Sequence, residues 1–159
     1  LNPHMLGWQI QPGTSWLQPY TQLQIKEIEE ELVWKLPNDV KTLLSVISGL
    51  NKPQIHLGTY IDQDLKYKQQ WKLNLESIKN QDWRSEFNSD VIYSAIGEEG
   101  LIPNFDPNDF LLLPIYAHRC IVCDKKNPNQ SIVLSVHGND VIIYGNDIRD
   151  YLQQEFLKD

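Results

Sequence analysis

Two cysteines stand three residues apart, as Cys120-Ile-Val-Cys123, and form the motif that comes nearest to a reactive site. A redox pair of this spacing needs a helix N-terminus to lower the pKa of its first thiol, whereas these residues lie in an apolar, strand-like run. Side chains three apart on a strand point to opposite faces. A zinc site would need two further ligands, and His56, His118 and His137 match no zinc template. We therefore predict structural thiols, with no metal and no cofactor.

His118 and Arg119 follow another apolar run and could act as a general acid and an anion clamp. Adjacent residues on a strand face opposite sides, so we expect the two side chains not to converge on one substrate and to have structural roles. An enzyme that uses His118, Arg119 or a loop carboxylate stays open as an alternative. The chain contains no nucleophile elbow, phosphate loop or dinucleotide fingerprint, and we predict a protein that is not an enzyme.

The segment 97–109 is punctuated by glycine and proline and predicts a long loop, a kind of segment in which function concentrates. Its carboxylates and its one aromatic residue are Glu98, Glu99, Phe105, Asp106 and Asp109. Trp83 lies in a polar stretch, and tryptophan is enriched at interface hot spots. We predict that these six residues form a surface for a basic protein partner. The opposing interpretation is that Trp83 and Phe105 cap the core and that the acids are only solvated.

The overall composition is that of one globular domain: 159 residues, 41% hydrophobic and 22% charged. With a net charge of −7 and no basic cluster, the chain is not expected to bind nucleic acid or an anionic membrane surface. No apolar run of spanning length and no export signal is visible, so we expect a cytoplasmic protein. Residues 1–4 are interpreted as a cloning remnant before a natural start at Met5, residues 1–20 as an irregular arm, and residues 21–159 as a single domain.

Apolar spacing predicts helices in the first half of the chain. Thr21-x-x-Gln24 has capping-box spacing before an apolar stripe, and Leu36-Pro37 ends that helix. Gly49 is the expected C-terminal stop of the second helix, which starts near Asn38. The predicted helices cover about residues 22–34, 38–48 and 62–80. A short strand is predicted over 91–96.

From residue 110 the pattern is typical of β-structure. A strand is predicted over 110–116, with residues 119–122 as its continuation, and Pro114 requires an edge position or a bulge. Strands over 132–136 and 141–144 flank a hairpin turn. Asn146 is expected to cap a closing helix with an apolar stripe. The predicted fold class is α+β, with a central, mostly antiparallel sheet on which N-terminal helices and a C-terminal helix pack.

Several motifs of this second half resemble one branch of the SUKH (SMI/KNR-like) superfamily. Residues 112–119, Leu-Leu-Pro-Ile-Tyr-Ala-His-Arg, are similar to its Leu-Ile-Pro-Ile-Tyr-x-His-Arg segment, and residues 135–145 to its Ser-Val-x-x-x-Asp-Ile-Ile-x-Tyr-Gly stretch. The Tyr-Leu and Glu-Phe pairs at 151–152 and 155–156 match the closing helix. The chain departs from the pattern at Cys120, where an aromatic residue is usual. The motif residues, interpreted as structural, are Pro114, His118, Arg119, Asp140, Tyr144, Gly145, Tyr151 and Phe156.

Near the N-terminus, Ile28-Glu29 and Leu36-Pro37 resemble the helix and the following Leu-Pro that open many such domains. The resemblance thus covers about residues 22–156 and implies an α+β binding protein. Many bacterial members are implicated as immunity proteins that neutralise cognate polymorphic toxins, and eukaryotic relatives are linked to cell-wall regulation and scaffolding. No catalytic residues are established for the family, so none are transferred to this chain. The resemblance implies a protein partner, expected to be a basic secreted toxin domain such as a nuclease. A regulatory scaffold is the alternative.

Overall fold

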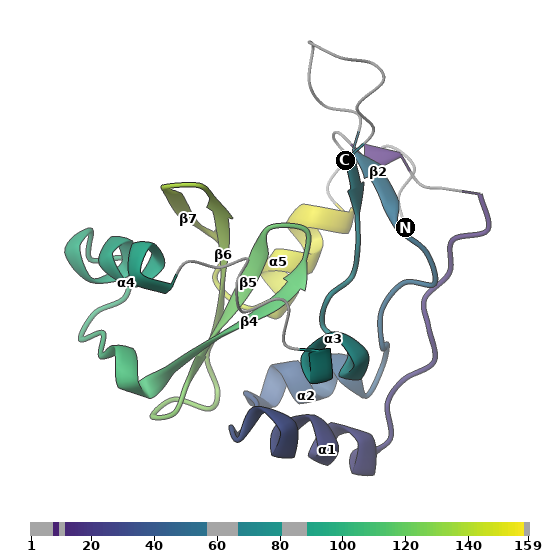
Figure 1. Ribbon diagram of the computed structural model, residues 1–159, viewed down its shortest axis with the longest axis horizontal. Coiled ribbons are helices and arrows are strands. Elements are labelled where there is room, and N and C mark those ends of the chain that lie inside the picture. Colours follow the sequence, from purple (N-terminus) through teal and green to yellow (C-terminus); the bar gives the residue numbers. More distant parts are fainter. Residues whose placement is uncertain (1–7, 10–11, 57–66, 81–88, 158–159) are drawn as a thin grey trace.

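A computed structural model describes residues 8–9, 12–56, 67–80 and 89–157 (Figure 1). Two antiparallel sheets are present in these residues. The smaller one has the order β1-β2-β3 and consists of Trp8–Gln9, Gln54–His56 and Tyr67–Gln69. The larger one is a meander of β4 (Phe110–Tyr116), β5 (Arg119–Asp124), β6 (Ser131–His137) and β7 (Asp140–Gly145), paired in that order.

The first helix, α1 (Gln22–Leu32), begins with the predicted capping box. The backbone N–H of Gln24 donates to Thr21 Oγ1 (3.2 Å), and the backbone N–H of Thr21 donates to Gln24 Oε1 (2.8 Å). Val33 ends the helix in the left-handed region, with φ 52°. The stripe of Ile25, Ile28 and Leu32 is buried as predicted, because these positions repeat on one face of the helix.

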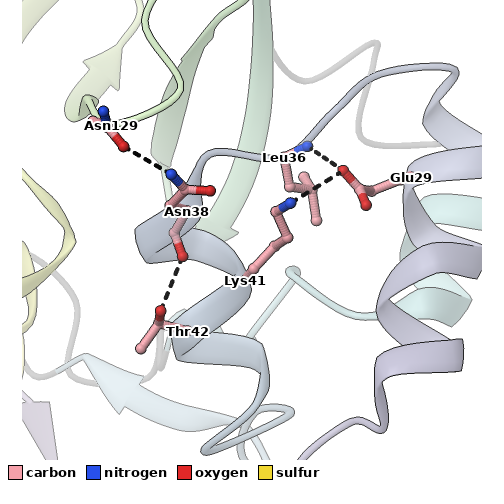
Figure 2. A network of polar contacts seen from close by, with 6 residues as sticks. All are labelled: Glu29, Leu36, Asn38, Lys41, Thr42 and Asn129. Carbon is pink, nitrogen blue, oxygen red and sulfur yellow. Dashed lines mark hydrogen bonds and ion pairs between the residues drawn. The ribbon is translucent and has the colours of Figure 1, made fainter.

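The break between α1 and α2 (Asn38–Leu44) is held by polar side chains, which Figure 2 shows. Glu29 Oε2 accepts the backbone N–H of Leu36 (2.8 Å) and lies 4.0 Å from Lys41 Nζ, so one carboxylate joins the two helices. Asn38 donates through its amide to Asn129 in the β5–β6 loop (2.7 Å). The predicted second helix was too long, because its regular part ends at Leu44.

The prediction of one helix over 62–80 is wrong for residues 67–74 and confirmed for residues 75–80. Residues 67–69 form β3, and only Leu75–Asn80 is helical (α3). Between them, Trp71 makes an isolated antiparallel bridge to Tyr116, and the Lys72 backbone N–H donates to the Ile115 carbonyl (2.8 Å). The apolar residues were read with a helical period, but this stretch is extended and lies along the edge of β4.

The predicted strand over 91–96 is also wrong. Residues Ser89–Glu98 form α4, in which Ile92 and Ile96 are fully buried. Short apolar runs fit either a helix or a strand, since positions four apart share a face in both. Packing of Ile92 and Ile96 against the sheet favours the helix here. Helix α4 therefore occupies part of the segment 97–109 that was predicted as a loop, and a 3₁₀ turn, η2 (Pro107–Asp109), occupies its end.

The four-stranded sheet follows the prediction at Pro114 and departs from it after Tyr116. Strand β4 is at the edge of the sheet, and its register shifts between Pro114 and Tyr116. The edge position and the bulge, either of which was expected to accommodate the proline, are therefore both present. Residues from Arg119 do not continue β4 but return as β5, because Ala117 adopts φ 52° in a tight turn. The predicted β6–β7 hairpin is confirmed, with Gly138 at φ 59° in its two-residue loop.

The closing helix begins one residue later than predicted. Asp147, and not Asn146, caps α5 (Ile148–Leu152) by accepting the backbone N–H of Asp150 (2.7 Å). A π-helical turn, η3 (Gln153–Leu157), continues it. Gly145 is needed for close approach: an added Cβ would lie 2.6–2.8 Å from atoms of Tyr151, including its backbone N.

The larger sheet is covered on both faces, and Figure 1 shows it between α4 and α5. On one face, α1, α2, α3 and α5 pack with the sheet into the main core, which includes Tyr151 and Phe156. On the other face, α4 encloses a second, smaller cluster with Phe110 and Leu134. The α+β fold class, with a C-terminal helix on an antiparallel sheet, is confirmed.

Candidate partner-binding surface

Helix α4 is amphipathic and presents a polar face to solvent. Ile92 and Ile96 point to the sheet, Tyr93 is half-buried against the same cluster, and Asp90 and Ser94 are exposed. The spacing of three and four residues between the buried positions produces one apolar stripe. The sheet thereby fixes the orientation of the helix, and the outer face is left for other contacts.

The segment 89–109 carries five carboxylates and contains no lysine, arginine or histidine. These acids are Asp90, Glu98, Glu99, Asp106 and Asp109, and all except the half-buried Asp109 are exposed. Four of the five belong to the predicted partner surface. We call this set the acidic face. A one-signed cluster of this kind attracts cationic groups and speeds the association of a basic partner.

Two of these acids also have partners within the protein. Asp109 Oδ2 lies 2.7 Å from Lys126 Nζ, and this ion pair raises the pKa of Lys126. Asp106 caps η2 by accepting the backbone N–H of Asn108 (3.0 Å). Glu98 and Glu99 make no ion pair within the described part of the chain. The negative charge available to a partner is therefore centred on these two glutamates.

The two aromatic residues of the predicted surface have different outcomes. Phe105 is half-buried, and its ring centroid lies 4.6 Å from that of Phe110 and 5.4 Å from that of Tyr93. Its ring belongs to the cluster beneath α4, which is the core-capping role that the sequence left open. Trp83 lies outside the described residues.

The motif residues of the second half meet in a buried polar cluster centred on Arg119. The guanidinium lies over the ring of Tyr144 (3.9 Å to its centroid), donates to Ser135 Oγ (2.6 Å) and pairs with Glu155 (3.3 Å). Glu155 is only 3% exposed and Arg119 8%. Buried charges persist only when paired, so this ion pair ties η3 to the sheet.

The prediction that His118 and Arg119 diverge is wrong. His118 lies in the tight turn and not in a strand, and its Nε2 faces Arg119 Nη1 (2.5 Å). The two side chains therefore contact each other at the turn between β4 and β5. Arg119 lies on the α5 side of the sheet, whereas the acidic face lies on the α4 side. The structure therefore does not bring these two groups together with Glu98 or Asp106 in one site.

Glu155 and Ser135 are the polar partners that sequence reasoning missed. Glu155 stands four residues after Tyr151, on the apolar stripe that also holds Ile148 and Phe156. A lone carboxylate on an apolar stripe indicates a buried cation, and this signal was available in the sequence. The serine carries no comparable signal, since its role depends on the cross-strand register Arg119–Ser135.

The remaining motif residues have separate positions. Asp140 is exposed at the start of β7, opposite His137. Tyr151 is fully buried, and this burial raises its pKa well above the usual value. It therefore stays protonated at neutral pH.

Both cysteines are fully buried and reduced. Cys123 packs in the main core and Cys120 in the cluster beneath α4, so they lie on opposite faces of β5 as predicted. Burial raises the pKa of both thiols, which keeps them protonated and unreactive. Among the described residues, no group of three or more histidine, cysteine, aspartate or glutamate side chains is arranged to hold a metal ion.

Comparisons of the chain with protein-family models, with curated proteins and with solved structures find no match. None of the helices in the described ranges is both long enough and apolar enough to cross a membrane.

Proposed function

We propose that this protein is a SUKH-like immunity protein of the bacterial cytoplasm that binds and neutralises a basic toxin domain through its acidic face. The observation that carries the proposal is the segment 89–109, which places four exposed carboxylates on one layer with no basic residue among them. The resemblance of the second half to the SUKH motifs supports the immunity role. A toxin nuclease has a basic cleft for its substrate, and an acidic surface is complementary to it.

The position of Glu98 and Glu99 gives a second argument. Glu98 is the last residue of α4 and Glu99 follows it directly, at the end where the helix dipole is negative and where lysine or arginine would be favourable. The last turn of α4 contains no basic residue. The two glutamates therefore oppose the stability of their own helix, and a cationic partner would relieve this repulsion.

The test combines binding with stability. The double variant Glu98→Lys/Glu99→Lys should bind a toxin domain encoded beside this gene at least about tenfold more weakly, through slower association that depends less on salt. The same variant should be more stable to urea by about 0.3–1 kcal/mol, because the helix-dipole interaction changes sign. Association rates at several salt concentrations and urea unfolding measure the two effects.

Helix α1 offers a matched control. Glu30 and Glu31 are exposed at its C-terminal end, which also lacks a basic residue in the last turn. Glu30→Lys/Glu31→Lys makes the same change in net charge in the same kind of position, and should leave the binding nearly unchanged. Unaltered toxin binding at low salt after reversal of Glu98, Glu99, Asp106 and Asp109 would contradict the proposed surface. A neighbouring toxin gene that is not lethal when this gene is deleted would contradict the function.

A further inference from the structure

The two edge strands of the larger sheet differ in whether another segment of the described chain covers them. Along β4, residues 70–73 act as a cover: the Lys72 backbone N–H donates to the Ile115 carbonyl (2.8 Å), and Ala117 donates to the Gln70 carbonyl (3.4 Å). Pro114 also removes one donor from that edge. β7 is the last strand in the order, and no described segment pairs with its outer side. Figure 1 shows β7 and α4 on the side of the molecule away from α1, α2 and α3.

The register of the β6–β7 hairpin determines which groups of β7 point outward. His137 and Asp140 close a two-residue loop, and such a closing pair exchanges hydrogen bonds. Because bonded and non-bonded pairs alternate, Ile142 bonds to β6, whereas Val141 and Ile143 direct their N–H and C=O groups away from it. No described backbone group accepts from or donates to these outward groups. They form a short template to which another strand can pair.

The side chains beside this template suit a strand rather than solvent. Ile142 is 48% exposed and Ile143 37% exposed, and as neighbours on a strand they lie on opposite faces of the sheet. An added strand would therefore meet an isoleucine on each face. Open edges are commonly protected by lysine or proline, and β7 contains neither. A bulge after Ile143 confines the regular template to Asp140–Ile143.

The surrounding charge distinguishes between two occupants. Residues 138–148 carry Asp140 and Asp147 and no basic residue, and α4, which bears Glu98, contacts β7. A second copy of the chain would bring a second negatively charged edge beside this one, and the repulsion between the two disfavours self-association. A strand with lysine or arginine side chains would meet opposite charge. We propose that β7 binds an extended basic segment of the partner by strand addition, a mode in which main-chain hydrogen bonds supply much of the affinity.

This inference rests on the proposed function only in that the partner is basic, so its test uses a defined peptide. The probe is a seven-residue alternating lysine–valine peptide with blocked ends, compared with its glutamate–valine counterpart. The lysine peptide should bind, and the glutamate peptide should not. In hydrogen exchange, the amides of Val141 and Ile143 should become protected on binding, whereas the Ile142 amide, already bonded to β6, should change little.

Two variants address the geometry and the charge. Ile143→Pro removes an outward donor without breaking a bond to β6, so it should fold with a normal melting curve and bind the peptide roughly tenfold more weakly. Asp140→Lys should weaken binding of the lysine peptide severalfold, whereas Glu30→Lys on α1 makes the same charge change away from β7 and should not.

The opposite results would overturn the inference. These are binding that protects other amides, affinity that Ile143→Pro leaves intact, or a dimer in sedimentation equilibrium that Ile143→Pro dissociates, which would assign the edge to a second copy. If the lysine peptide fails to bind while Glu98→Lys/Glu99→Lys still weakens toxin binding, strand addition is wrong and the proposed function stands. If charge reversal on the acidic face has no effect on toxin binding but the peptide protects the amides of Val141 and Ile143, strand addition stands and the proposed binding surface is wrong.

Discussion

Arg119 is the residue whose surroundings say most about how the second half of the chain is held together. Its guanidinium contacts Tyr144 in β7, Ser135 in β6 and Glu155 in η3, and the turn residue His118 completes the set. Arginine suits this position because its planar fork can stack on an aromatic ring and donate in several directions at once. One side chain thus fixes the position of η3 relative to three strands.

Breaking this ion pair should be costly. Glu155→Gln leaves the Arg119 charge buried without its carboxylate, and we expect a loss of about 3–5 kcal/mol in the free energy of unfolding. The matched control is Glu27→Gln, which removes an exposed ion pair with Lys79 (2.7 Å) and should cause no measurable loss. Urea unfolding measures both variants. Equal stability of the two variants would show that the buried pair has no special role.

The thiols of Cys120 and Cys123 should make stability depend on alkaline pH. Their pKa values in the folded protein are raised by burial from the usual value of 9.0. Below about pH 9 both states hold the protons and the full stability is present; above it the unfolded state loses them first, so stability falls as pH rises. The slope is up to about 1.4 kcal/mol per pH unit for each thiol.

Urea midpoints between pH 8 and pH 10.5 would measure this slope. Cys120→Ala/Cys123→Ala should flatten it, whatever its effect at neutral pH. The buried Tyr151, whose pKa is also raised, contributes to the alkaline loss in both proteins and cancels in the comparison. Parallel curves for the two proteins would mean that the thiols are accessible in the folded state.

At the scale of elements, the contact between β7 and α5 depends on the absence of a side chain at Gly145. The position of α5 is set by its cap at Asp147 and by Tyr151, whose backbone approaches this glycine closely. The family-like Tyr-Gly pair at 144–145 therefore has a packing explanation in this chain. Glycine is required at position 145 because the Tyr151 backbone leaves no room for a Cβ atom.

Gly145→Ala should destabilise the protein by about 1–3 kcal/mol, because the new methyl group would overlap the Tyr151 backbone. Gly97→Ala is the natural comparison. Gly97 lies in α4, where an added Cβ meets only Phe105 at 3.9 Å, and the substitution should stabilise the helix by about 0.5–1 kcal/mol. Thermal and urea unfolding would measure whether each substitution lowers or raises the free energy of unfolding. A loss for Gly97→Ala would mean that α4 packs differently from the arrangement described here.

The helices and strands show what one sequence can predict. The capping box of α1, the β6–β7 turn and the position of Pro114 follow from local chemistry, and each was predicted. Residues 67–74 and 91–96 were assigned to the wrong class because short aromatic and apolar runs fit both periods, and tertiary packing decides between them. The pair Arg119–Glu155 spans 36 residues and could be found only by asking what a lone acid does on an apolar stripe.

At the scale of the whole molecule, the sheet separates two hydrophobic layers of unequal size. The main core joins the larger sheet to four helices, whereas in the described residues the smaller cluster joins it to α4 and to the segment 101–105 that follows. Trp16 also contributes to the main core, with its ring edge-on to those of Trp71 (5.9 Å) and Phe156 (5.8 Å). The larger layer is therefore contacted by several parts of the chain, whereas the smaller one depends on one helix and the short segment that follows it.

We expect α4 to open independently of the rest. Native-state hydrogen exchange should give its amides a lower free energy of opening than the amides of β5, because release of α4 exposes only the smaller cluster. Ile96→Ala should lower the opening free energy of α4 further. Identical opening free energies for α4 and β5 in low denaturant would indicate a single cooperative unit.

The placement of one cysteine on each face of β5 has a practical consequence. Cys120 lies beneath α4 and Cys123 beneath the opposite layer, and both are fully enclosed. A thiol reagent can reach either sulfur only after the layer above it has moved, so the labelling rate of each cysteine reports the opening of one side of the sheet. The native chain therefore needs no added probe for such a measurement. A partner bound to α4 should lower the labelling rate of Cys120 and leave that of Cys123 unchanged.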